Sequence, residues 1–222
     1  MNKLMFVCAG VAASSASATV LTFDPLPFNG AQLSQAYGDS VMSALQDGFS
    51  YGTDFGPTPN IVAAYGTGST VNTAVLQWAD QFGDLTNIAY GTENAQQLLV
   101  TLTADAGWLV DLRGFDIAGW PVVDYTINSV EVLANGSAVF SETNVLVRGA
   151  TLDAEGRRHT SFDFAQGLQA REITIALDVS NITGTAQDNI GIDNVAFAQV
   201  VPAPGVAGSL LAAAAFGVRR RR

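Results

Sequence analysis

The sequence predicts an all-β protein, a jelly-roll-type antiparallel β-sandwich, because strand patterns and turn signals fill the middle of the chain. Apolar residues occupy every second position in stretches such as Ile173–Val179, as a strand with one buried face requires. The pair Asn135-Gly136 separates two strand-like stretches and is a strong signal for a two-residue hairpin. Helical periodicity is scarce, and only Gln32–Gln46 and Glu93–Leu99 are ambiguous. About ten short strands with turns between them are typical of sandwiches and jelly rolls.

The expected strands are short runs rich in β-branched and aromatic residues, bounded by turn-forming residues. They are Thr19–Phe23, Asn60–Tyr65, Val71–Ala79, Leu98–Thr103, Trp108–Ala118, Thr126–Leu133, Ala138–Glu142, Thr160–Phe164, Glu172–Val179 and Gly191–Val200. We assign residues 19–200 to this domain, residues 1–18 to a leader and residues 201–222 to a C-terminal tail. A chain of 222 residues has room for one such core, but not for two, once both ends are set aside.

Residues 1–18 match a secretory signal peptide. Lys3 supplies a positive start, Leu4–Ala13 is an apolar run, and a stretch of small residues ends in the pattern Ala16-Ser17-Ala18. This arrangement predicts export, with cleavage after Ala18. The single cysteine, Cys8, lies in the leader, so the exported protein is expected to lack disulfides, thiolate nucleophiles and cysteine metal ligands.

The middle of the chain is strongly acidic. All 20 acidic residues lie between Asp24 and Asp193, whereas the same part has no lysine and only five arginines, which are Arg113, Arg148, Arg157, Arg158 and Arg171. Such a surface repels phosphate backbones, so the sequence argues against nucleic-acid binding. It suits cations, neutral glycans or an extracellular medium.

The C-terminal tail has three parts. Val201-Pro202-Ala203-Pro204-Gly205 ends the last strand, because two prolines this close together cannot continue a ladder. Val206–Val218 is a run of thirteen residues without a charge, and the chain ends in Arg219, Arg220, Arg221 and Arg222. As a helix the apolar run spans about 20 Å, less than a bilayer core of about 30 Å. The positive-inside rule keeps the terminal arginines cytoplasmic.

This tail resembles the PEP-CTERM sorting signal, in which a proline motif, a short apolar helix and a basic cluster follow in the same order. The resemblance implies an exosortase-like processing enzyme as partner, transient or stable anchoring in the membrane through the tail, and a destination at the cell surface or in the extracellular matrix. It also implies a link to exopolysaccharide. Ala203 stands where the family motif has a glutamate, so a plain tail anchor is the alternative.

The two ends of the domain resemble the first and last strands of galactose-binding-like jelly rolls. The opening stretch is Leu21–Asp24, and the closing stretch is Asp188–Phe197, with the sequence DNIGIDNVAF. The resemblance implies a structural calcium ion that bridges these strands, with Asp24 and Asp193 as candidate ligands, since calcium prefers carboxylate and amide oxygens. The alternative is that Asp193 and Asn194 form a bond within a turn or bulge and that Asp24 caps its strand.

Aromatic residues offer a candidate glycan site. Trp78 and Trp108 are expected in the core, whereas Trp120 lies in a turn between a glycine and a proline and is the candidate for stacking on a sugar ring. Aromatic-glycine pairs also recur at irregular spacing, and their aromatic members are Tyr37, Tyr51, Tyr65, Phe82 and Tyr90. We interpret these residues as plugs at the ends of the sandwich, with an aromatic-lined cleft for sugars as the alternative.

The sequence favours a non-catalytic protein. His159 is the single histidine and follows two arginines in a polar turn, so we expect a solvated loop residue. No nucleophile elbow, P-loop or dinucleotide fingerprint occurs in a suitable setting. A glycosidase needs only two carboxylates, and Asp111, Asp116 and Glu131 are candidates on neighbouring expected strands. We therefore expect an exported surface or matrix protein with polysaccharide as its candidate partner. A secreted glycan-active hydrolase and a purely structural protein are the alternatives.

Overall fold

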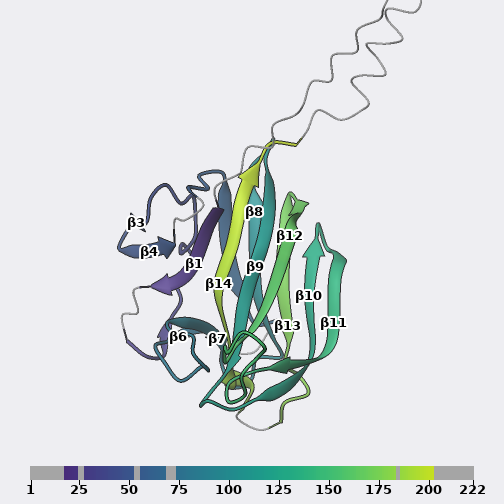
Figure 1. Ribbon diagram of the computed structural model, residues 1–222. Coiled ribbons are helices and arrows are strands. Elements are labelled where there is room, and N and C mark those ends of the chain that lie inside the picture. The colour runs from purple at the N-terminus through teal and green to yellow at the C-terminus, as the bar shows by residue number, and fades with distance from the viewer. Residues whose placement is uncertain (1–17, 25–27, 53–55, 69–73, 184–185, 203–222) are drawn as a thin grey trace, which may run out of the picture.

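The computed structural model describes residues 18–24, 28–52, 56–68, 74–183 and 186–202, which form two antiparallel β-sheets (Figure 1). The sheets pack face to face and fill the space between them with apolar side chains, so the prediction of an all-β antiparallel sandwich is confirmed. These ranges contain one 3-10 turn, η1 (Ala186–Asn189), and no α-helix. Among the residues described, no helix is long and apolar enough to cross a membrane.

The smaller sheet has five strands in the order β11-β10-β13-β8-β5. Its strands are β5 (Ile61–Gly66), β8 (Gln97–Ala104), β10 (Tyr125–Ala134), β11 (Ser137–Val147) and β13 (Glu172–Asp178). Alternate residues point into the core, as in β13, where Ile173, Ile175 and Leu177 are fully buried. The expected hairpin joins β10 to β11, and Asn135 and Gly136 adopt the positive φ angles of a type I′ turn, 49° and 78°.

The larger sheet has nine strands and is organised around β14 (Ile190–Val200). One edge of β14 pairs with β9 (Leu109–Gly119), which also pairs with β12 (Thr160–Ala170). The other edge pairs first with β7 (Ile88–Gly91) and then with β1 (Ala18–Asp24). Four short strands extend these two arms: β6 (Val75–Trp78) and β2 (Ala31–Gln32) beyond β7, and β4 (Phe49–Gly52) and β3 (Leu45–Gln46) beyond β1.

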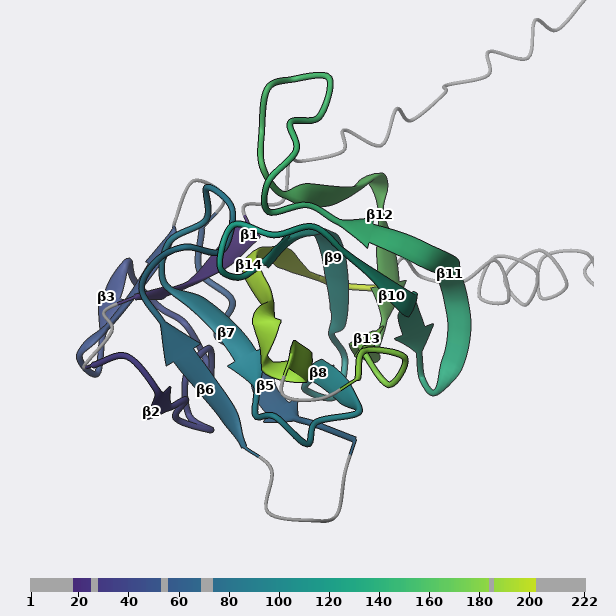
Figure 2. The ribbon, with the colours of Figure 1, turned by 90° about the horizontal axis from the view of Figure 1, so that it is seen from below.

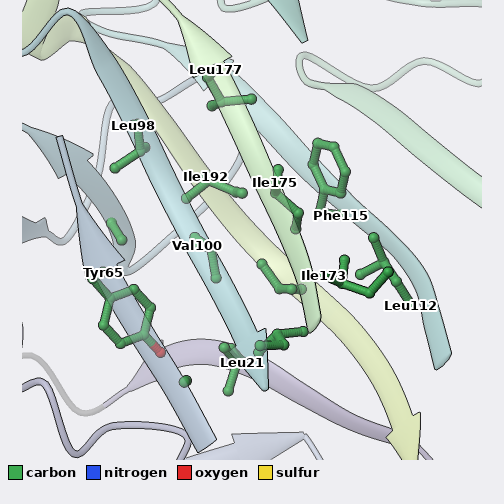
Figure 3. Packing of buried hydrophobic residues seen from close by; sticks show 14 of the residues in the cluster. Leu21, Tyr65, Leu98, Val100, Leu112, Phe115, Ile173, Ile175, Leu177 and Ile192 are labelled. Atoms are coloured by element: carbon green, nitrogen blue, oxygen red, sulfur yellow. The ribbon is translucent and has the colours of Figure 1, made fainter. Parts of the chain in front are cut away.

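The core lies between the two sheets (Figure 3). The larger sheet contributes buried side chains such as Leu21, Leu112, Phe115 and Ile192, and they face Val100 and its neighbours on the smaller sheet. Burying one side chain of this size contributes about 1.5–3 kcal/mol. At one lateral edge of the sandwich β11 lies beside β12 (Figure 2). The ring of Phe140 there packs edge-on against Phe162, with centroids 5.8 Å apart, and covers the open side of the core.

All ten expected strands are present, with their ends shifted by a few residues. The sequence did not indicate β2, β3, β4 and β7, which have two to four residues each. Neither ambiguous segment is helical, and each donates a backbone hydrogen bond to a part of the chain that is distant in the sequence. The N–H of Leu33 donates to the carbonyl of Val75 (2.9 Å), and the N–H of Gln97 donates to the carbonyl of Thr67 (3.1 Å).

The processing segments lie almost entirely outside the described residues. Outside them are Ala16, Ala203, Pro204, Gly205 and Arg219–Arg222. At the start of the domain, β1 begins at Ala18, which is buried and pairs with Ala198. At its end, β14 stops at Val200, and Val201 and Pro202 continue as exposed, irregular chain.

A buried network of tyrosines holds an unusual backbone conformation at Phe23. The φ angle of Phe23 is 53°, in the left-handed region that is costly for a bulky residue. Its N–H donates to the Tyr37 hydroxyl (2.6 Å), and its carbonyl accepts a hydrogen bond from Gln77 Nε2 (2.7 Å). Tyr37 stacks on Tyr51, and burial raises the pKa of the Tyr37 hydroxyl, which stays protonated. Tyr37, Tyr51 and Tyr65 belong to the main core and do not line a cleft for sugars.

We expect Tyr37→Phe to lower the free energy of unfolding by about 1–3 kcal/mol, because the buried N–H of Phe23 loses its acceptor. Chemical denaturation of both proteins measures the difference. Tyr90→Phe is the matched control, since the Tyr90 hydroxyl makes no hydrogen bond to the described residues. The control should change stability by less than about 0.5 kcal/mol. Equal losses in the two variants would contradict this role of the Tyr37 hydroxyl.

Candidate functional site

An aromatic hollow lies at the end of the sandwich where β6, β7 and η1 meet, the lower end in Figure 1. Its volume is about 90 Å³. The lining residues come from the end of β6, the loop after it, β7, the turn after β9, and η1. They are Trp78, Phe82, Tyr90, Trp120, Asp188 and Asn189. We call this site the aromatic hollow.

The rings of the aromatic hollow pack mainly edge to face. The Trp78 ring lies 6.2 Å from that of Trp120, at 74°, and 6.4 Å from that of Tyr90, at 83°. Gly191 of β14 makes this packing feasible, because a Cβ atom there would lie 2.9 Å from the Phe82 ring. The sequence placed Trp120 in an exposed turn and Trp78 in the core. Trp120 lies in the expected turn but is half-buried, and Trp78 is also half-buried, because the two rings pack against each other beside a small cluster separate from the main core.

Hydrogen bonds hold Trp120 in place. The backbone N–H of Trp120 donates to the carbonyl of Asn189 (2.9 Å), and the backbone carbonyl of Trp120 accepts from the Tyr125 hydroxyl (2.7 Å). The Asn189 side chain donates to the same hydroxyl (2.7 Å). The turn is tight at Gly119, where a Cβ atom would lie 2.2 Å from the carbonyl oxygen of Val123. The side of the hollow formed by Trp120 and Asn189 is thus held by bonds that exist without a ligand.

A second hollow shares Tyr90 and Asp188 with the first. Its volume is about 340 Å³, and it is lined by Leu76, Tyr90, Thr92, Glu93, Asn94 and Asp188. Burial raises the pKa of Asp188, and the charge of Glu93 raises it further. Among the described residues that line the two hollows, none is basic. We call this second site the acidic hollow.

The two hollows together present aromatic rings beside hydrogen-bonding groups. Aromatic rings pack against apolar faces, and convergent carboxylate and amide groups orient a polar ligand. In addition, the indole nitrogens of Trp78 and Trp120 are buried and have no hydrogen-bond partner among the described residues. Buried donors without partners are uncommon in folded proteins. The arrangement is suited to a ligand that has both an apolar face and hydroxyl groups.

A pair of neighbouring carboxylates, one buried and one half-buried, lies elsewhere, on the outer face of the larger sheet. Asp193 of β14 is directly opposite Asp116 of β9 and is only 4% exposed. Burial raises the pKa of Asp193 to about 8, and the negative charges of Asp116 and Asp24 contribute to this rise. The hydrogen bond that the backbone N–H of Asn194 donates to Asp193 Oδ1 (2.7 Å) opposes it. Asp193 is therefore protonated at neutral pH. The alternative interpretation of Asp193 and Asn194 as a bulge is confirmed, since the register of β14 shifts at this point.

The candidate calcium ligands, Asp24 and Asp193, are close enough for their charges to interact. Asp24 accepts a hydrogen bond from Asn87 Nδ2, and burial raises its pKa. Within the described part of the chain, no group of three or more histidine, cysteine, aspartate or glutamate residues is placed to hold a metal ion. Calcium at Asp24 and Asp193 thus stays a prediction from the resemblance, and its binding would have to displace the proton of Asp193.

The expectation for His159 was wrong, because its side chain is only 13% exposed. Its Nδ1 lies 2.7 Å from Asp84 Oδ1, and its Nε2 lies 3.7 Å from Asp116 Oδ1. Burial alone would raise the pKa of Asp84, but hydrogen bonds from the N–H of Arg158 and from His159 lower it. His159 therefore joins the loop after β6 to the start of β12, and this histidine is a structural contact.

The carboxylates named as candidate catalysts do not form a pair. Asp111 is fully buried and bonded to Arg113. Asp116 follows it by five residues, about 16 Å along an extended strand, and is bonded to Ser161 Oγ (2.6 Å). Glu131 lies on β10 of the other sheet and points away from the core, because both of its neighbours are fully buried. The placement of Glu131 beside the other two was wrong, since β9 and β10 belong to different sheets.

Sequence reasoning named one residue of the aromatic hollow, Trp120, as the candidate sugar contact and placed Trp78 in the core. Phe82 and Tyr90 were present among the aromatic-glycine pairs, but the pattern did not separate them from the three core tyrosines. Asp188 and Asn189 were noted only as part of the closing strand pattern. The sequence carries no signal that η1 folds against β7, because this contact depends on the pairing of β7 with β14.

We expect the stability of the protein to depend on pH through Asp193. Between about pH 4 and pH 8 the folded protein keeps a proton at Asp193 that the unfolded chain releases, so the free energy of unfolding falls as the pH rises through this window. Asp193→Asn keeps the acceptor for Asn194 and removes the titration. The variant should match the wild type near pH 4 and exceed it by several kcal/mol above about pH 8, as measured by denaturation with a chelator present. A constant difference across this window would contradict the raised pKa.

Calcium titration of the same two proteins provides the control. At alkaline pH calcium should raise the melting temperature of the wild type, because a ligand that binds only the folded state stabilises it. Asp193→Asn should lose most of this rise. If neither the melting temperature nor the calorimetric heat responds to calcium, the calcium prediction is wrong.

Comparison with known proteins assigns neither a family nor a ligand. No family model and no curated protein matches the chain. Among solved structures it is similar to the family 32 carbohydrate-binding module of C. perfringens NanJ in complex with galactose, at 12% identity and a TM-score of 0.29, over 63% of this chain and 93% of that one. It is also similar to the enzymatically active domain of bacteriophage CBA120 tailspike protein 4, at 18% identity and a TM-score of 0.28, over 64% of this chain and 19% of that one. A β-glucosidase from Kluyveromyces marxianus matches at 13% identity and a TM-score of 0.24, over 86% of this chain and 22% of that one.

Proposed function

We propose that this chain is an exported, non-catalytic jelly-roll-type sandwich of the cell surface or extracellular matrix, and that it binds a glycan in the aromatic hollow. The observation that carries the proposal is the joint lining of one hollow by Trp78, Trp120, Tyr90, Asp188 and Asn189. A sugar ring has an apolar face of C–H groups and a rim of hydroxyls. Aromatic rings next to carboxylate and amide groups match both parts.

The preformed geometry of the hollow supports binding. Two backbone hydrogen bonds hold Trp120 to Asn189 and Tyr125, and a third joins Asn189 to Tyr125, so little ordering is required when a ligand arrives. A volume of about 90 Å³ suits part of one sugar ring at a time, which favours a single residue of a longer polymer.

The alternative of a glycan-active hydrolase has one pair of carboxylates in its favour, Asp188 and Glu93, which line the acidic hollow together. The raised pKa of Asp188 is a property of a general acid. Glycoside hydrolysis requires two carboxylates at a fixed separation. Glu93 lies exposed on a turn, and we therefore favour binding over hydrolysis. Release of reducing ends from a polysaccharide panel would favour the hydrolase, whereas retention without products would favour the binding protein.

We expect Trp120→Ala to weaken glycan retention by about tenfold or more, because the substitution removes one wall of the hollow. Affinity electrophoresis on immobilised galactan, glucan, chitin and chitosan measures retention. Trp108→Ala is the matched control, since this tryptophan packs against the main core and not in the hollow. Circular dichroism establishes that both variants are folded. Equal retention of the two folded variants would contradict the assignment of the site.

Export and sorting rest on the sequence of the two ends. We propose that the leader is cleaved and that an exosortase-like enzyme processes the PEP-CTERM-like tail, with the membrane as a transient or stable anchor. The tail starts where the ladder of β14 stops, at Val200, so removal of the tail would leave the sandwich complete. The acidic charge of the domain is compatible with an extracellular, polysaccharide-rich setting and argues against nucleic-acid binding.

The intact mass of the protein from its native host, measured by cell fraction, tests this proposal. We expect the mass to correspond to loss of Met1–Ala18 and of the residues after about Pro204, because the leader ends in a small-residue cleavage pattern and the tail follows the last residue of β14. A mature protein that keeps Val206–Arg222 would reduce the tail to a simple membrane anchor. A protein that keeps Met1–Ala18 would contradict export by a cleaved leader.

A further inference from the structure

The aromatic hollow does not end at Tyr90 and Asp188, because both residues also line the acidic hollow. A ligand that stacks on the rings of the first therefore brings its next substituent to the second. On that side it meets two carboxylates, Asp188 and Glu93, and the neutral polar groups of Thr92 and Asn94. The aromatic site and the acidic site are thus adjacent, an arrangement that a site for neutral sugars does not need.

We propose that the acidic hollow binds the ammonium group of an amino sugar, so that the glycan recognised by this protein contains glucosamine-type residues. The inference rests on the proposed function of the aromatic hollow and assigns its ligand class. The sugar ring would contact Tyr90 and the tryptophans, while the ammonium group would lie between Asp188 and Glu93. Charge-assisted hydrogen bonds from an ammonium to carboxylates are stronger than those between neutral groups.

The charges of the free protein favour this ligand. Asp188 and Glu93 repel each other, and no basic residue among the described lining residues compensates them. The raised pKa of Asp188 reports burial and this repulsion. A cation between the two carboxylates removes the repulsion and restores part of the lost solvation. A uronic acid would add a third negative charge at the same place, and a neutral sugar would leave the repulsion unchanged.

The whole chain is acidic, so a cationic glycan is also attracted without any specific site. The test must separate this general attraction from the hollow. Glu142 on β11 provides the comparison, because it is exposed and belongs to the smaller sheet, whereas both hollows lie at the larger one. Glu93→Gln and Glu142→Gln remove the same charge and keep nearly the same shape.

The experiment is calorimetric titration of the mature protein with the tetrasaccharides of glucosamine and of N-acetylglucosamine, at low salt and at a pH that keeps the amino groups protonated. We expect the glucosamine tetrasaccharide to bind about tenfold more tightly than the acetylated one. Glu93→Gln and Asp188→Asn should each reduce this preference by about threefold or more, and Glu142→Gln should leave it unchanged. Trp120→Ala should weaken binding of both tetrasaccharides.

Three results would overturn the inference. If the two tetrasaccharides bind equally, the hollow does not select the ammonium group, and the proposed glycan site still stands. If Glu142→Gln lowers the preference as much as Glu93→Gln, the selection comes from the overall charge of the domain. If neither tetrasaccharide and no neutral polysaccharide of the panel binds, the proposed function itself fails, and the inference fails with it.

Discussion

The ladder of β14 is the interaction on which the rest of the sandwich depends. This strand pairs with β9 along one edge and with β7 and β1 along the other, so it connects the parts of the larger sheet that come from the beginning, the middle and the end of the chain. Its inward residues, including Ile192, Val195 and Phe197, are fully buried in the core. Both hollows also lie at its N-terminal end, since η1 leads directly into it and β7 pairs with its first residues.

The bulge in β14 lets one strand bury apolar residues on both sides of it and still place Asp193 on the outer face of the sheet. Inward residues alternate at Ile190 and Ile192 and then at Val195 and Phe197, which is a step of three residues instead of two. The left-handed conformation of Asn194, with a φ angle of 51°, absorbs the extra residue. The bulge keeps both apolar stretches in the core and leaves Asp193 on the outer face, opposite Asp116. Burial of that carboxylate raises its pKa and destabilises the fold above neutral pH.

The hollows depend on packing of a different kind, between loops at one end of the sandwich. Trp120, Asn189 and Tyr125 form a closed set of hydrogen bonds, and Gly191 provides the space for the Phe82 ring. The strands supply a rigid base, and the loops supply the groups that differ in chemistry. Aromatic rings on one side and carboxylates on the other are the physical basis for the proposed recognition of amino-sugar glycans through shape and charge.

The sequence by itself determined the fold class, the positions of ten strands and the hairpin at Asn135, because alternation and turn chemistry are local properties of the chain. It also determined the acidic charge that argues against nucleic-acid binding. Only the tertiary structure decided which aromatic residues are core and which line a site. Tyr37 and Tyr90 carry the same local motif, yet the first lies between the sheets and the second at their end. The same holds for His159 and for the carboxylates, whose partners are separated by up to 78 residues in the sequence and meet only through strand pairing. Burial and contact of such residues are long-range properties, and local sequence patterns do not encode them.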